Sequence, residues 1–111
     1  MSQPSIFTKI INHEVPSTIQ YEDEEFIAFN DIYPQAPVHV LIVPKKQYAT
    51  LEEISMDDTT FHSNLLLTAR KVAKKLGISE NYKILMNVGP KMQLVPHLHV
   101  HLMGGWENPT P

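Results

Sequence analysis

The chain has 111 residues, nine Lys and Arg against twelve Asp and Glu, six His and no Cys, which gives a formal net charge of −3. With 42% hydrophobic and 19% charged residues, its composition is that of a globular protein rather than a disordered or membrane protein. The absence of Cys excludes disulfides, thiolate zinc sites and a cysteine nucleophile. The acidic balance argues against nucleic acid as a partner, because that needs a basic face.

At this length we expect one domain, covering residues 1–111. The first eleven residues contain no uninterrupted apolar stretch that resembles a signal peptide or a membrane span. A cytoplasmic protein with no membrane partner is the expectation.

Taken in chain order, the spacing of apolar residues predicts two helices and five strands. A short amphipathic helix begins at Ile6 and ends near His13, and a long helix covers about residues 56–76. Ser55 with Asp58 resembles a capping box for the long helix, and Gly77 ends it. The predicted strands cover residues 19–22, 26–30, 38–43, 82–87 and 97–103.

The first two strands flank the polar segment 22–25, which predicts a hairpin. The order of elements lacks regular strand–helix–strand units. It therefore favours an α+β fold, an antiparallel sheet of about five strands with two helices covering one face.

His97, His99 and His101 alternate with apolar residues, so that on a strand the three imidazoles line one face. Three interpretations of this pattern are open. The strand is simply amphipathic, with histidines on its exposed face. Alternatively the histidines hold a metal, although the outer α-carbons lie roughly 13 Å apart at strand spacing, too far to share one ion easily.

The third interpretation is nucleophilic catalysis. A neutral imidazole, available near pH 7, attacks a phosphorus centre and forms a labile phosphoramidate intermediate. Neighbouring imidazoles then supply protons and hydrogen bonds to the oxygens.

The segment around the histidines reads Gln93-Leu94-Val95-Pro96-His97-Leu98-His99-Val100-His101-Leu102-Met103. It resembles the signature of the histidine triad (HIT) superfamily, in which Gln and Val precede three histidines separated by apolar residues. Segments 6–11, 28–39 and 43–46 and Asn87 stand in the order seen in its Hint branch.

The resemblance implies a HIT-like fold whose sheet continues across a homodimer. It implies a hydrolase with no metal or other cofactor. The substrates would be purine nucleoside phosphoramidates or acyl-nucleotides, attacked at the α-phosphate, with a nucleoside monophosphate such as AMP or GMP released.

The resemblance also assigns roles to individual residues. His99 is the nucleophile that carries the nucleotidyl group, and the other catalytic residues are His97, His101 and His39. The nucleotide-binding set is Phe29, Asp31, Ile32, Asn87, Gln93, His99 and His101. Without the family, Phe29 and Ile32 read as core, Asp31 and Asn87 as turn residues, and His39 as a half-buried strand residue. His13 and His62 match nothing and are expected at the surface.

Two departures bear on function. Hint proteins commonly place Ser after the glutamine, where its hydroxyl bonds the leaving group, and this chain has Leu94, which donates no hydrogen bond. The preceding loop, 88–92, is shorter and poorer in glycine than the Hint loop. A dinucleoside polyphosphate hydrolase and a weakly catalytic nucleotide-binding or interaction module therefore stay open. Trp106 either borders the leaving-group site of a partner protomer or covers its own surface.

Overall fold

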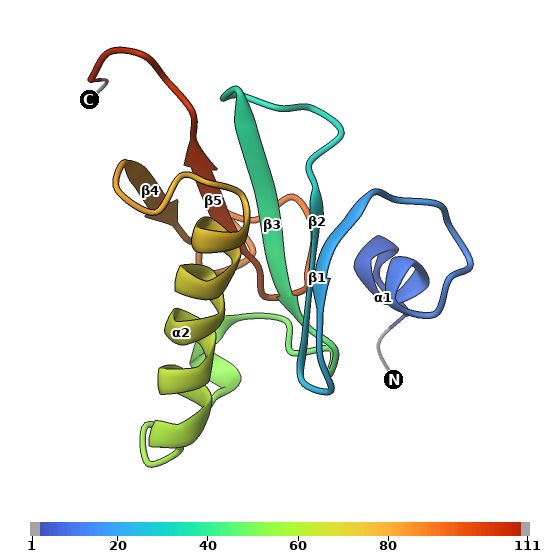
Figure 1. Cartoon of the computed structure of the whole chain (residues 1–111). Coiled ribbons are helices and arrows are strands. Elements are labelled where there is room, and N and C mark those ends of the chain that lie inside the picture. Colours follow the sequence, from blue (N-terminus) through green and yellow to red (C-terminus); the bar gives the residue numbers. More distant parts are fainter. Residues whose placement is uncertain (1–2, 110–111) are drawn as a thin grey trace.

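The computed structural model describes residues 3–109, in which one five-stranded sheet separates two helices (Figure 1). The helices are α1 (Ile6–Ile11) and α2 (Thr59–Lys75), with a 3-10 turn η1 (Leu51–Glu53) before α2. The strands are β1 (Ile19–Glu22), β2 (Phe26–Asn30), β3 (Val38–Pro44), β4 (Tyr82–Leu85) and β5 (Val100–Gly104). Their order is β1-β2-β3-β5-β4, with every neighbouring pair antiparallel. The predicted α+β architecture and hairpin are confirmed.

The start of α2 corrects the predicted cap. Asp58, not Ser55, is the N-cap, and its carboxylate accepts the backbone N–H of Phe61 at 3.0 Å. The Ser55 hydroxyl accepts from Asp57 N–H and shapes the turn before the helix. The helix ends as expected, since Gly77 adopts φ 75°, a conformation that glycine tolerates best.

The helices lie on opposite faces of the sheet rather than on one, which corrects the expectation (Figure 1). One face packs Val40, Ile42, Val100 and Leu102 against the apolar side of α2. The other packs Phe29 and its neighbours against Phe7 and Ile10 of α1. This happens because β2 and β3 are apolar at consecutive positions and so bury both faces.

The histidine strand is shorter than predicted, because β5 begins at Val100 and leaves His97 and His99 in the extended segment before it. Pairing with β3 runs from Val38↔Gly104 to Ile42↔Val100. Beyond it, Pro44 has no N–H to donate and its carbonyl oxygen accepts from the His97 ring, so the ladder cannot continue.

The strand predicted over 82–87 ends at Leu85, so that Asn87 lies in the following loop. Within residues 3–109, none of the helices is both long enough and apolar enough to cross a membrane.

Candidate active site

The three histidines of the motif lie at one end of the sheet, on the face that α1 partly covers. His97 is fully buried, His99 is 7% exposed, and His101 is half-buried on β5. The alternation of faces holds through the irregular segment, since Leu98, Val100 and Leu102 all join the core beneath α2. The imidazoles therefore line one face as predicted, but two of the three are enclosed rather than exposed.

Backbone and hydroxyl groups fix the protonation of the His97 ring. Its Nε2 lies 2.9 Å from the carbonyl oxygen of Pro44, which can only accept, so Nε2 carries the proton. Its Nδ1 lies 2.6 Å from the hydroxyl oxygen of Ser5 and accepts that hydroxyl proton. His97 is thus held as a neutral imidazole with both nitrogens bonded.

His99 has the opposite arrangement, which leaves one nitrogen free. Its Nδ1 lies 2.7 Å from the carbonyl oxygen of His97 and donates to it. In a neutral ring the lone pair therefore stands on Nε2, the form a nucleophile needs. The Phe7 ring contacts the imidazole in an edge arrangement, with ring centroids 5.0 Å apart, and restricts the tilt of the ring.

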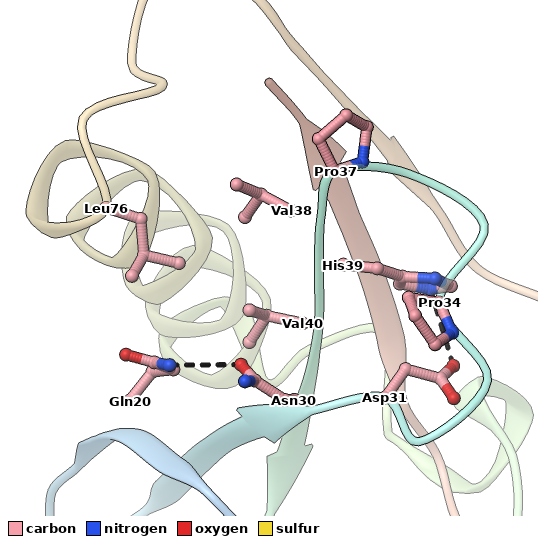
Figure 2. Close-up of a pocket in the computed structure, with 9 residues that line it drawn as sticks. All are labelled: Gln20, Asn30, Asp31, Pro34, Pro37, Val38, His39, Val40 and Leu76. Carbon is pink, nitrogen blue, oxygen red and sulfur yellow. Dashed lines mark hydrogen bonds and ion pairs between the residues drawn. The ribbon is translucent and has the colours of Figure 1, made fainter. Parts of the chain in front are cut away.

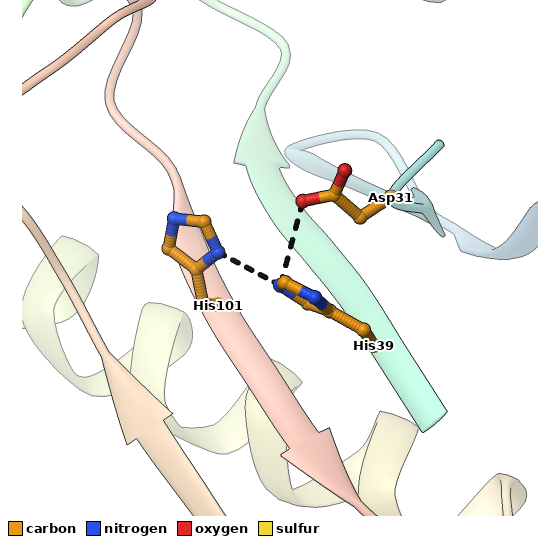
Figure 3. Close-up of side chains that lie close together, drawn as sticks. All are labelled: Asp31, His39 and His101. Carbon is orange, nitrogen blue, oxygen red and sulfur yellow. Dashed lines mark hydrogen bonds and ion pairs between the residues drawn. The ribbon is translucent and has the colours of Figure 1, made fainter. Parts of the chain in front are cut away.

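His101 belongs to a second hydrogen-bonded chain (Figure 3). The backbone N–H of Gln35 donates to His39 Nδ1 at 3.0 Å, so His39 carries its proton on Nε2. That nitrogen lies 2.9 Å from His101 Nδ1 and 3.4 Å from the Asp31 carboxylate. His101 Nδ1 therefore accepts, and the His101 proton stands on Nε2. His39 therefore lies in direct contact with the triad.

Burial favours the neutral form of three of these imidazoles, those of His97, His101 and His39. It lowers the pKa of His97, and the neighbouring His99 lowers it further, against the opposing effect of the Pro44 carbonyl. Burial also lowers the pKa of His101 and of His39, while the Asp31 carboxylate partly offsets the decrease in both. The surroundings therefore favour the neutral form of His97, His101 and His39.

Comparison with known proteins places this arrangement in a family. The family model described as HIT domain matches residues 12–108. The chain belongs to the HIT domain family. It is similar to the 14 kDa zinc-binding protein of Zea mays, 46% identical over 108 residues that cover 92% of this chain and 82% of that protein.

Two further similarities cover nearly all of this HIT domain. The adenylylsulfatase HINT1 of Arabidopsis thaliana is 45% identical over 108 residues, which cover 92% of this chain and 71% of that protein. The solved structure of a HIT family hydrolase from Clostridium thermocellum superposes with a TM-score of 0.88 at 45% identity, covering 99% of this chain and 98% of that one.

Asp31, His39 and His101 are the described residues of this HIT domain that come together as metal ligands do, with their ligand atoms within 4.8 Å of one another. The protonation pattern opposes that use. A metal on His39 Nε2 would move the proton to Nδ1, where it would face the N–H of Gln35. The donor set does not fit a resident metal.

The other predicted binding residues lie in different surroundings. Phe29 is buried beside Phe7, with ring centroids 5.5 Å apart, whereas Ile32 is 80% exposed. Asn87 is half-buried in the loop after β4. His13 and His62 are exposed, as expected.

Gln93 uses its amide to close the loop that precedes the triad. Its side-chain oxygen accepts from Gly89 N–H at 2.8 Å, and its amide nitrogen donates to the carbonyls of Ala49 and Val95. The next residue, Leu94, projects entirely into solvent. A contact of Gln93 with nucleotide stays a prediction, and these three bonds show that the side chain also holds the loop.

A cavity of about 300 Å³ lies near Asp31 and His39, but it opens on the wrong face for this chemistry (Figure 2). Val38, Val40 and Leu76 point into it from the α2 side of β3, whereas the His39 and Asp31 side chains project to the other side. The residues that line it do not include His97, His99 or His101.

Sequence reasoning missed the groups that orient the imidazoles, namely Ser5, Phe7, Gln35 and Pro44. Ser5 carried one usable signal, as a serine directly before a helical pattern. Gln35 and Pro44 act through backbone atoms, which no side-chain pattern reveals.

Proposed function

We propose that this HIT domain is a nucleotide hydrolase acting on the α-phosphate of purine nucleoside phosphoramidates or acyl-nucleotides. The observation that carries the proposal is the His99 ring, whose Nδ1 donates to the His97 carbonyl and whose Nε2 has a free lone pair. The Arabidopsis relative is an adenylylsulfatase by name, and adenylyl sulfate also has an activated α-phosphate.

The reaction takes two displacements at phosphorus. His99 Nε2 attacks the α-phosphorus, a P–N bond forms to the ring, and the bond to the leaving group breaks. The proton stays on His99 Nδ1, and its hydrogen bond to the His97 carbonyl stabilises the ring as positive charge develops. Water then attacks phosphorus, the P–N bond to His99 breaks, and a nucleoside monophosphate is released.

His101 and its chain act at the phosphate oxygens. Because His101 Nδ1 accepts from His39, its Nε2–H is a donor for an oxygen that gains charge in the transition state. The Asp31 carboxylate is an acceptor suited to ribose hydroxyls and is held in place by the backbone N–H of Tyr33. No step uses a metal.

A second copy of the chain is the proposed protein partner, paired along β4. This strand is an edge of the sheet, and it exposes Ile84 and Leu85 at 39% and 44%. Beside it, Leu66, Ile84 and Met86 line an apolar hollow of about 160 Å³. Pairing of two such edges would continue the sheet and cover this surface. A light-scattering mass of twice 12.7 kDa tests it.

The decisive experiment measures hydrolysis of an adenosine phosphoramidate by the wild type, His99→Ala and the control His13→Asn. Asparagine tolerates the φ of 60° that His13 adopts, so the control keeps its backbone. We expect kcat/KM to fall on the order of 10⁴-fold or more in His99→Ala and to stay unchanged in the control. Brief mixing with substrate should leave an acid-labile nucleotidyl group on wild-type protein only.

Two outcomes would favour the alternatives. Absence of turnover with AMP still binding would leave a nucleotide-binding module. Turnover of diadenosine polyphosphates but not of phosphoramidates would favour the polyphosphate hydrolase.

A further inference from the structure

The hydroxyl of Ser5 lies where the N-terminus of α1 meets the first histidine of the triad. Ser5 is the N-cap of α1, and its Oγ accepts the backbone N–H of Thr8 at 3.0 Å. The same Oγ lies 2.6 Å from His97 Nδ1, across 92 positions of sequence. Ser5 is itself buried, so both contacts are shielded from water.

The Ser5 hydroxyl has two acceptors within reach, Thr8 Oγ1 at 3.4 Å and His97 Nδ1 at 2.6 Å, and the contact with His97 is much the shorter. The Thr8 hydroxyl donates to the Gln47 side-chain oxygen at 2.6 Å, which leaves it no proton for His97. Its oxygen is also 3.5 Å from His97 Nδ1, against 2.6 Å for Ser5. Because His97 Nε2 must donate to the Pro44 carbonyl, Nδ1 needs a donor, and Ser5 is the hydroxyl placed to supply it.

Gln47 in turn holds Ser5 in position. Its side-chain oxygen accepts the backbone N–H of Ser5 at 2.8 Å as well as the Thr8 hydroxyl. Its amide nitrogen donates to the carbonyl of Gln3. The start of α1 is therefore bound to the segment that follows β3, with the His97 ring between them.

We propose that Ser5 is a positioning residue of the catalytic centre. Its hydroxyl holds the His97 ring as the Nε2–H form bonded to Pro44, and this keeps the His97 carbonyl where it accepts the Nδ1 proton of His99. The inference rests on the proposed role of His99 as nucleophile. Ser5 touches no substrate and acts through His97.

The chemistry of the link explains why a hydroxyl is needed there. Ser5 must accept a hydrogen bond from Thr8 N–H and donate one to His97 Nδ1 at the same time. A hydroxyl does both, and a carboxylate or methyl group does not. Without the donor, the cheapest response of the buried Nδ1 is to take up a proton or to turn away from Ser5. Either response changes the hold on the carbonyl that orients His99.

Three substitutions separate this role from helix capping. Ser5→Thr keeps both the cap and the donor, Ser5→Asp keeps the cap but has no proton to donate, and Ser5→Ala removes both. Ser63→Ala, at an exposed position of α2, is the matched control. All proteins are compared well below their melting temperatures, which are measured in parallel.

The readouts are the imidazole ¹⁵N signals of His97 and His99 and the kinetics on an adenosine phosphoramidate. In the wild type we expect His97 protonated on Nε2 and His99 on Nδ1. Ser5→Asp and Ser5→Ala should change the His97 signals and lower kcat about 10-fold, with KM within about 2-fold of wild type. Ser5→Thr and Ser63→Ala should match the wild type in both readouts.

A role limited to capping predicts that Ser5→Asp behaves as the wild type, and that result overturns the proposal. So does an altered His97 signal with unchanged kcat. If the wild type itself shows no turnover, the proposed function fails separately. The role of Ser5 is then judged from the His99 ¹⁵N signals alone. The proposal requires that Ser5→Asp shift these signals away from the Nδ1–H form. Should Ser5→Asp not fold, Ser5→Ala against Ser5→Thr gives the same comparison.

Discussion

The two ends of the histidine triad differ although they carry the same side chain. At one end His97 is enclosed, and both ring nitrogens bond to groups that do not titrate near neutral pH, a hydroxyl and a backbone carbonyl. At the other end His101 is half-buried and bonds to His39, a second titratable ring that lies beside the Asp31 carboxylate. The first arrangement fixes a position, and the second can adjust its protonation.

The difference shows that spacing along a strand assigns a face but not a role. Residues 97, 99 and 101 share a face, yet their partners come from α1, from the backbone and from β3 respectively. His99 lies between the enclosed end at His97, called the closed end, and the open end at His101. Its Nδ1 donates to the His97 carbonyl, and its ring contacts that of His101, with ring centroids 5.1 Å apart. A fixed ring at His97 and a ring able to change its protonation at His101 suit the proposed nucleophile, which takes up the nucleotidyl group and then releases it.

The largest expected difference between the two ends of the triad is in their contribution to stability. His97→Ala removes the acceptor of the Ser5 hydroxyl and the ring N–H that bonds to the Pro44 carbonyl, and it leaves a cavity, which should lower the free energy of unfolding by about 3 kcal/mol. His101→Ala should cost less than about 1.5 kcal/mol, because the His39 Nε2–H still has the Asp31 carboxylate nearby. Urea denaturation of both variants measures this.

His13→Asn, at an exposed position whose φ of 60° asparagine tolerates, is the control and should change stability by less than about 0.5 kcal/mol. Equal losses in His97→Ala and His101→Ala would contradict the distinction between a closed and an open end.

The sequence predicts the part of the site that depends on the alternation of side chains along a strand. Leu98, Val100 and Leu102 lie in the core under α2 because every second residue faces the same way, even where the ladder has not begun. The five strands, the hairpin and the two helices follow from the same periodicities. The errors lie at the ends of helices and strands, as at Ser55 and His97, where a hydrogen bond rather than the spacing of apolar residues determines where the element begins.

The unpredicted part is the set of long-range polar contacts. The bond from Ser5 to His97 spans 92 positions, and apolar spacing carries no information about it. The N-terminal helix was predicted, but not that it would cover the imidazoles. Burial of both faces of β2 and β3 is visible in their unbroken apolar runs, and that signal favours a helix on each side.

A gradual loss of stability is expected when the pH is lowered. In the folded protein the pKa values of His97, His101 and His39 lie below the ordinary 6.5, so the unfolded chain binds more protons. Stability should be complete above about pH 7 and fall as the pH drops through 6.5, by up to about 1.4 kcal/mol per pH unit for each imidazole.

Urea denaturation between pH 7.5 and 5 measures this slope. His39→Gln should reduce it by removing one titrating group, whereas His62→Ala should lower it much less than His39→Gln does. A slope of zero across this range would mean that the imidazoles titrate alike in both states, against the enclosure described for them.

The smallest effect concerns Leu94, which lies next to the loop-closing Gln93 and is fully exposed. The family resemblance leads us to expect a serine at this position, and leucine offers no proton to a departing amine. Leu94→Ser should raise kcat on phosphoramidates of basic amines about 5-fold, the value of one hydrogen bond of about 1 kcal/mol, since protonation limits the departure of that group. Acyl-nucleotides, whose carboxylate leaving group departs unprotonated, should gain nothing.

The matched control is Met92→Ser, which changes an exposed apolar residue of the same loop. An equal gain on both substrate classes, or an equal gain from Met92→Ser, would show that loop polarity rather than proton donation sets the rate. A gain confined to amines would place residue 94 at the leaving group.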